Sequence, residues 1–166
     1  GKYTVSGSIA AWHLLNLLDL LRRGPGRGAV VSEAALLDEC RWQLDWLLRM
    51  QVRPGEPLAG MAFHRVHGTV WSPMPGWAHQ DPTARVLHRP STAATLHLSA
   101  VAAQAARLVR DIDRGYANRL LTAARTAHRA AYAHPNLIAP DDEGQFGGGP
   151  YGDSELDDDF YWAASE

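Results

Sequence analysis

An acidic run near the end of the chain holds the densest group of side chains that could bind a metal ion or take part in acid and base chemistry. The segment "GDSELDDDF" places four aspartates and one glutamate within seven residues, from Asp153 to Asp159. Calcium and other hard cations bind clustered carboxylate and backbone oxygens. Acidic residues at the start of a helix also satisfy free N–H groups and suit the helix dipole without any metal. The residues alone favour capping, because the ligand spacing and glycine of an EF-hand loop are absent.

A second candidate site is the segment "FHRVHGTVW". His64 and His67 would share one face of a helix, but the flanking glycines indicate extended chain, and no third ligand is near. A ligand cleft formed by His67, Trp71 and Trp77 explains the segment better. Indole faces offer apolar platforms, and an imidazole supplies a hydrogen bond to a polar ligand such as a sugar. The alternative is that these aromatic side chains fold back onto the core.

No pair of carboxylates suited to acid and base catalysis emerges from the pattern. Such chemistry needs two groups that face each other across a cleft. Asp158 and Asp159 are adjacent and lie at an expected helix start, whereas Asp38, Glu39 and Asp45 lie among ordinary surface charges on a regular helix. We therefore assign no catalytic residue to this chain.

Composition excludes several classes of partner. The 166 residues carry a formal net charge of -2, and the arginines are scattered over alanine-rich helices, so we expect no nucleic-acid partner. No apolar run reaches the roughly 20 residues of a membrane span, so we expect no membrane partner. The single cysteine, Cys40, excludes an internal disulfide. The segment "GGGPYGD" lacks the Lys and Ser/Thr of a phosphate-binding loop, and we expect no organic cofactor.

Five helical segments must position these groups. By apolar spacing and by cap residues they are expected at 5–23, 32–50, 91–109, 113–134 and 154–166. Ser32 is the expected N-cap of the second helix, and Ser91 or Thr92 that of the third. The first helix is apolar on nearly every side, which is typical of a helix buried all round. No strand pairs emerge, so the predicted fold class is all-α, with helices in inner and outer layers.

Six stretches carry a family resemblance, and they are "GKYTVSGSIAAWHLLN", "LLDECRWQLDWLLRMQV", "GEPLAGMAFHRVHGTVW", "RPSTAATLHLSAVAAQAARL", "GGGPYGD" and "DDDFYWAASE". They occur in the order found in bacterial glycoside hydrolase family 9 and cover almost the whole chain. The sequence therefore resembles an internal fragment of the catalytic domain of a family 9 endoglucanase.

The resemblance implies an (α/α)6 barrel. Residues 1–166 would be a fragment of a single catalytic domain, incomplete at both ends, with about five of the twelve helices. In the family, an Asp-Ala-Gly-Asp turn that supplies the general base stands directly before the position of Gly1. The general acid, a glutamate, follows later than Glu166. We therefore expect the isolated chain to be inactive.

The resemblance also implies site residues. The expected substrate-binding residues are His67, Trp71 and Tyr151. The expected ligands of a structural Ca²⁺ are Ser154, Glu155 through its carbonyl, Asp158 and Asp159, so the resemblance favours a metal where the residues alone favour capping. Gly68 departs from the family pattern, in which an aspartate is frequent beside the histidine.

The activity implied for the intact protein is cleavage of β-1,4-glucosidic bonds in cellulose or a related β-glucan, with inversion. An exo-acting enzyme on cello- or glucosamine oligosaccharides is the enzymatic alternative, and a non-catalytic helical carbohydrate-binding module is the other. The expected partners are the glucan substrate and the rest of the same catalytic domain. Composition leaves the compartment open, and the resemblance implies an extracellular or periplasmic protein.

Overall fold

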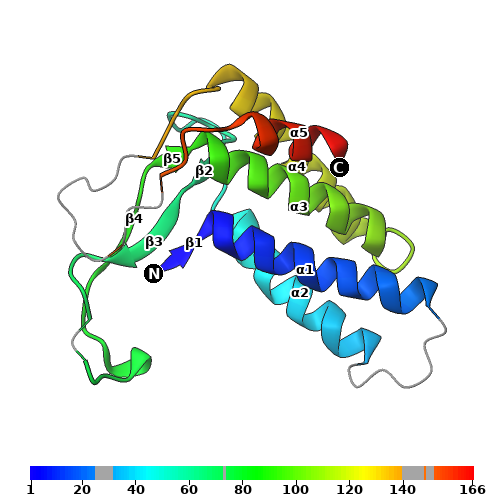
Figure 1. Cartoon of the computed structure of the whole chain (residues 1–166), viewed down its shortest axis with the longest axis horizontal. Helices are drawn as coiled ribbons and strands as arrows, with labels where there is room; N and C mark the ends of the chain where they lie inside the picture. Colours follow the sequence, from blue (N-terminus) through cyan, green and yellow to red (C-terminus); the bar gives the residue numbers. More distant parts are fainter. Residues whose placement is uncertain (25–31, 73, 140–147, 149–151) are drawn as a thin grey trace.

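The computed structural model describes residues 1–24, 32–72, 74–139, 148 and 152–166. Within these residues the chain is mainly helical, and all five expected helices are present (Figure 1). In chain order the elements are β1 (Lys2–Tyr3), α1 (Thr4–Arg23), α2 (Glu33–Arg49), β2 (Ala62–Phe63), β3 (Arg65–Gly68), the 3-10 helix η1 (Ala78–Gln80), β4 (Arg85–Leu87), β5 (Pro90–Ser91), α3 (Thr92–Val109), α4 (Arg114–Ala133) and α5 (Asp157–Ser165).

Short polar side chains set the starts of three helices. Ser32 Oγ and Ser91 Oγ each accept a hydrogen bond from the backbone N–H three residues later, at 3.1 and 3.2 Å. Asp113 Oδ1 does the same for α4 at 2.9 Å. Each bond satisfies one of the amides that a helix start leaves without an intrahelical partner. The expected Ser32 cap is thus confirmed, and Ser91 rather than Thr92 caps α3.

Helix α3 is the centre of the molecule. It packs against α1, α4 and α5, and Figure 1 shows its green ribbon between them. Fifteen of its 18 residues are buried. Many of them are alanines, whose small side chains let neighbouring helices approach closely. A helix covered on nearly every side by other helices is an inner-layer element, as the sequence predicts for part of this fold.

The other helices present one apolar face to this centre. Helix α1 also packs against α2, and the main core joins them through Leu15, Leu44, Leu98 and Leu120. On α4, Tyr116, Leu120, Ala124, Ala127 and Ala131 are buried, while Arg119, Arg125 and Arg129 are exposed. This division makes α4 amphipathic, in agreement with the apolar spacing by which its helix is expected at 113–134.

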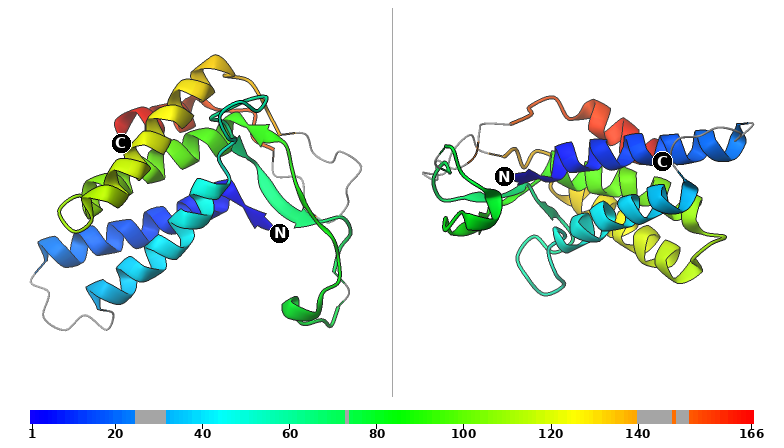
Figure 2. Two further views of the ribbon diagram at one scale, coloured as in Figure 1. Left: turned by 180° about the vertical axis from the view of Figure 1, so that it is seen from behind. Right: turned by 90° about the horizontal axis from the view of Figure 1, so that it is seen from below.

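The expectation that no strands pair is wrong. Strands β1, β3 and β4 form an antiparallel sheet in that order, and β2 pairs with β5. Each strand has only two to four residues. Strands this short contain too little alternation of apolar and polar residues to be recognised from the pattern. The fold class itself is unchanged, because the strands form a small addition at one end of the helices (Figure 2).

Helix α1 is less buried than its composition predicts. Leu20 is 66% exposed, and Ile9 and Leu17 are about 40% exposed. These side chains form an apolar stripe on the face of α1 turned away from the core. None of the described helices is both long enough and apolar enough to cross a membrane.

Candidate functional site

The three-stranded sheet holds His67 at the end of the helical body. His67 lies on the central strand β3, opposite Val86 of β4. Its Nδ1 atom lies 2.8 Å from the carbonyl oxygen of Gly68. A carbonyl only accepts hydrogen bonds, so Nδ1 carries a proton. Nε2 is buried, with no hydrogen-bond partner within the described part of the chain.

His88 lies beside both His67 and a third histidine, His64. The ring of His88 lies 5.7 Å from that of His64 and 6.0 Å from that of His67, centroid to centroid. His64 Nδ1 is 2.9 Å from Ser91 Oγ. All three rings are buried. Among the described residues, no group of three or more His, Cys, Asp or Glu side chains is spaced to hold a metal ion.

Trp71 differs from His67 in accessibility. Trp71 follows β3 and is 66% exposed, whereas His67 is fully buried. Of the two, only Trp71 presents an open aromatic face to a ligand. The third expected substrate residue, Tyr151, lies outside the described residues.

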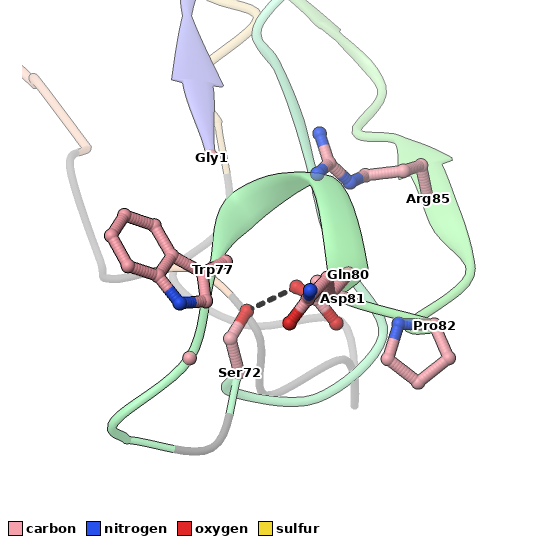
Figure 3. Close-up of a pocket in the computed structure, with 8 residues that line it drawn as sticks. Gly1, Ser72, Trp77, Gln80, Asp81, Pro82 and Arg85 are labelled. Carbon is pink, nitrogen blue, oxygen red and sulfur yellow. Dashed lines mark hydrogen bonds between the residues drawn. The ribbon is translucent and has the colours of Figure 1, made fainter.

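A cavity of about 400 Å³ lies beside the sheet, in the loop that joins β3 to β4. Figure 3 shows the residues that line it, with Trp77 on one flank and Arg85 on β4 at the other. The lining consists of Gly1, Ser72, Gly76, Trp77, Gln80, Asp81, Pro82 and Arg85. A Cβ built on Gly1 would lie 3.3 Å from His67 Cβ, so the cavity adjoins the strand that carries the histidine.

Asp81 organises this loop. Ser72 Oγ donates to its Oδ2 at 2.5 Å, and the backbone N–H of Thr83 donates to its Oδ1 at 2.9 Å. These hydrogen bonds, that of the Ser72 hydroxyl first, lower the pKa of Asp81 to about 2. A carboxyl group with so low a pKa stays ionised and cannot donate a proton as a general acid near neutral pH.

Gly68 is required by the same loop. A Cβ on this residue would lie 2.9 Å from Thr83 Cγ2 and 2.9 Å from the carbonyl oxygen of Val70. Such contacts are shorter than real side chains make, so the departure from the aspartate frequent in the family has a packing reason. Thr83, next to the loop-organising Asp81, occupies the space that a side chain at position 68 would need.

The acidic run begins α5, but its carboxylates do not cap the helix. The N-cap is Leu156, and no side chain makes a capping hydrogen bond there. Asp159 is buried, and its Oδ1 lies 2.8 Å from His97 Nε2 on α3. Asp153 Oδ1 accepts from the backbone N–H of Glu155 at 3.0 Å. The capping hydrogen bonds favoured by the residue pattern are therefore absent at the start of α5, and the acidic charges there interact with the helix dipole instead.

The acidic residues instead border a second cavity. It has a volume of about 460 Å³ and is lined by Val5, Ile9, Trp12, His97, Asp153, Asp158, Asp159 and Trp162. Asp159 Oδ2 is buried and lacks a hydrogen-bond partner in the described segments. Ser154 and Glu155 are exposed on the segment just before α5. A buried carboxylate oxygen without a donor is costly in free energy, so this atom is suited to a cation or another donor.

Sequence reasoning missed several of these residues. The sequence alone assigns no role to Asp81 and Arg85 in the first cavity, or to His97 in the second. The run Asp81, Pro82 and Thr83 is a typical turn signal, because an aspartate side chain accepts from the amide two residues later. No local pattern could have paired His97 with Asp159, which lie 62 residues apart in the chain.

Comparison with known proteins identifies the class to which this helical fold and its loop site belong. The chain belongs to glycosyl hydrolase family 9, whose family model matches residues 1–166. It is 49% identical over 179 aligned residues to endoglucanase C of Cellulomonas fimi, a match that covers 100% of this chain and 16% of the relative.

Two more proteins are similar. The cellulose 1,4-beta-cellobiosidase of Acetivibrio thermocellus is 38% identical over 183 residues, covering 100% of this chain and 20% of the relative. The crystal structure of the family 9 endoglucanase J30 matches with a TM-score of 0.84 and 31% identity, covering 99% of this chain and 32% of that chain.

The solved family 9 structures are (α/α)6 barrels, so the five described helices are a segment of such a barrel. This confirms the predicted fold class and the family resemblance. The chain spans only 16% and 20% of the length of the two curated relatives.

Proposed function

We propose that the full-length protein hydrolyses β-1,4-glucosidic bonds in cellulose or a related β-glucan. The observation that carries this proposal is the family 9 match over the whole chain. It is supported by the exposed indole of Trp71 and by the cavity beside β3, whose lining combines apolar and polar groups, because sugars present both apolar faces and hydroxyl groups to a binding site.

In the proposed mechanism, residues 1–166 bind and orient the glucan within a single catalytic domain. One carboxylic acid protonates the departing oxygen, while a carboxylate activates a water on the opposite face of the sugar. We infer both groups from the resemblance, the base in a turn just before Gly1 and the acid in a segment beyond Glu166. Gly1 lies against β3, so the turn would deliver its carboxylate beside His67 and the cavity.

His67, Trp71 and Tyr151 remain the proposed substrate-binding residues. For His67, the hydrogen bond of Nδ1 to the Gly68 carbonyl leaves Nε2 as the ring atom that a ligand would use, and this atom is buried in the described part of the chain. Trp71 offers an apolar face to the pyranose ring.

The experiment is hydrolysis of cellulose, mixed-linkage glucan and chitosan oligomers by the full-length protein, with the first-formed anomer observed by proton NMR. We expect release of β-glucan fragments with the α-anomer appearing first, because a single displacement inverts the β-linkage. The β-anomer as the first product, or no hydrolysis of any β-glucan, would overturn the proposal. The isolated residues 1–166 should release no sugar above a blank.

An exo-acting enzyme on cello-oligosaccharides is the second candidate, favoured by the cellobiosidase relative at 38% identity. The two modes differ in product pattern. An endo-acting enzyme lowers the viscosity of soluble carboxymethylcellulose after few cleavages, whereas an exo-acting enzyme releases cellobiose with little change in viscosity.

We also propose that a structural Ca²⁺ binds at the start of α5, held by Ser154, the Glu155 carbonyl, Asp158 and Asp159. The ion would supply no chemistry to the reaction; it would fix the segment before α5. Two observations support the proposal: Asp159 Oδ2 is buried without a donor, and the carboxylates of Asp153 and Asp158 line the same cavity. No three acidic side chains in the described part of the chain are spaced to hold a metal ion, so the ion would have to draw these ligands together.

An enzyme that degrades an insoluble polysaccharide must meet its substrate outside the cytoplasm. We therefore propose an extracellular or periplasmic location for the full-length protein. Cell fractionation with an antibody against residues 1–166 tests it, and recovery in the cytoplasmic fraction alone would contradict it.

A further inference from the structure

The cavity in the β3–β4 loop combines one aromatic face with several hydrogen-bonding groups. Trp77 is 72% exposed, so most of its indole surface is open to solvent. Gln80, Asp81 and Arg85 line the same cavity and provide an amide, a carboxylate and a guanidinium. A flat apolar platform beside donors and acceptors matches the two faces of a pyranose ring, whose C–H groups are apolar and whose hydroxyls are polar.

The loop holds this arrangement before any ligand binds. Asp81 accepts hydrogen bonds from Ser72 and Thr83, which connect the two ends of the segment that carries Trp77. The segment between them includes η1, whose Gln80 N–H donates to the Trp77 carbonyl at 2.9 Å. A site built on ordered backbone loses less conformational entropy on binding than a flexible loop would.

Asp81 keeps binding capacity after organising the loop. An ionised carboxylate has about four acceptor positions, and hydrogen bonds from Ser72 and from the side chain and amide of Thr83 leave at least one of them open. Arg85 supplies charged donors at the opposite wall (Figure 3). The cavity thus offers one negative and one positive charge, which favours a neutral polyhydroxylated ligand over an acidic or a basic sugar.

The cavity adjoins the strand that carries His67. Arg85 pairs with Gly68, the residue directly after His67, in the β3–β4 register. Gly1 forms part of the cavity wall and also lies against His67. The cavity therefore lies within a few residues of the strand at which the glucan is proposed to bind.

We propose that Trp77, Gln80, Asp81 and Arg85 form a separate subsite that binds one neutral pyranose unit of the β-glucan, stacked on the indole of Trp77. This inference rests on the proposed function, because the proposed function supplies the identity of the ligand, a β-glucan. A volume of about 400 Å³ lies at the lower end of the range for small-ligand pockets, in agreement with a single sugar unit. The subsite would set the preferred length of oligosaccharide substrates.

The test compares kcat/KM of the full-length protein and its Trp77→Ala variant on cello-oligosaccharides from cellotriose to cellohexaose. In the unaltered protein kcat/KM should rise at the length that first reaches the subsite. Trp77→Ala should remove that increment, a loss of about tenfold on the longer substrates, and leave the shortest substrate unchanged. Trp77→Phe should retain part of the increment, because it keeps an aromatic face.

Met74→Ala is the matched control. Met74 is 93% exposed in the same loop and does not line the cavity. Equal losses in Met74→Ala and Trp77→Ala, or an unchanged length profile in Trp77→Ala, would overturn the subsite while the proposed function stands.

Calorimetric titration with cellohexaose separates the two proposals. If the full-length protein hydrolyses no glucan but binds cellohexaose in a Trp77-dependent way, the proposed function fails and the subsite stands. If it neither hydrolyses nor binds cellohexaose, both fail.

Discussion

His97 on α3 and Asp159 on α5 form a buried pair in which Nε2 lies 2.8 Å from Oδ1. Their side chains are only 9% and 7% exposed. The ring of Trp162 packs edge-on against His97, with centroids 5.0 Å apart. The pair therefore links the central helix directly to the helix that the acidic run begins.

Replacement of His97 by Leu should destabilise the full-length protein by about 2 kcal/mol, because it leaves a buried carboxylate oxygen without its donor. The measurement is the free energy of unfolding in urea. His134→Leu is the control, since the His134 side chain is exposed at the end of α4. Equal free energies for the two variants would show that the His97 hydrogen bond contributes nothing.

Calcium should raise the thermal stability of the full-length protein. Ligand linkage predicts a gain of about 2.7 kcal/mol at a free concentration one hundred times the dissociation constant. A calorimetric scan with excess CaCl₂ or with EDTA measures it, and the difference should vanish in Asp158→Asn. A midpoint that does not depend on EDTA would contradict the calcium site and leave the acidic run with the hydrogen bonds of Asp153 and Asp159 and the interaction of Asp158 with the helix dipole.

The hydrogen bonds to Asp81 should persist throughout the ordinary pH range. Its pKa in the folded protein is lowered from 3.8 to about 2. The contribution of the ionised Asp81 carboxylate to the stability of the folded protein is therefore complete above pH 3.8 and is lost only as the pH falls through about 2. Asp81→Asn should lower kcat/KM on cellohexaose by a constant factor from pH 4 to pH 8. A change in the shape of the pH profile would contradict this.

A larger side chain on α3 should be poorly tolerated. Ala102 is fully buried, and Ala102→Leu should cost about 1–3 kcal/mol, because the packed helices around α3 leave no space for it. Ala133→Leu, at the exposed end of α4, is the matched control. The melting temperatures of the two variants would coincide if α3 were loosely packed.

The exposed apolar stripe of α1 should be covered in the full-length barrel. Leu20 is 66% exposed in this chain. Leu20→Glu should cost the full-length protein about 2 kcal/mol, because a buried leucine would be replaced by a charge. The same change should reduce aggregation of the isolated chain, measured by light scattering. Asn118→Glu, on an exposed position of α4, should alter neither property.

Helix positions were predictable because their causes are local. The apolar spacing of α4 and the serine cap of α2 depend on residues three or four positions apart. The short strands escaped prediction, since a strand such as Lys2–Tyr3 is stabilised only by its partner Arg65–Val66, more than sixty residues away in the chain. Likewise, only the geometry of the folded turn shows that Ser91, and not Thr92, is the N-cap of α3.

The sequence by itself determined the family, the helical class and the presence of an aromatic loop after His67, because residue types and their order carry that information directly. Only the tertiary structure decided which side chains meet. In the folded chain His67 is buried, Trp77 is exposed beside Asp81 and Arg85, and His97 is hydrogen-bonded to Asp159. Contacts between distant segments depend on how helices and strands pack together, and that packing is a property of the whole core rather than of any local stretch.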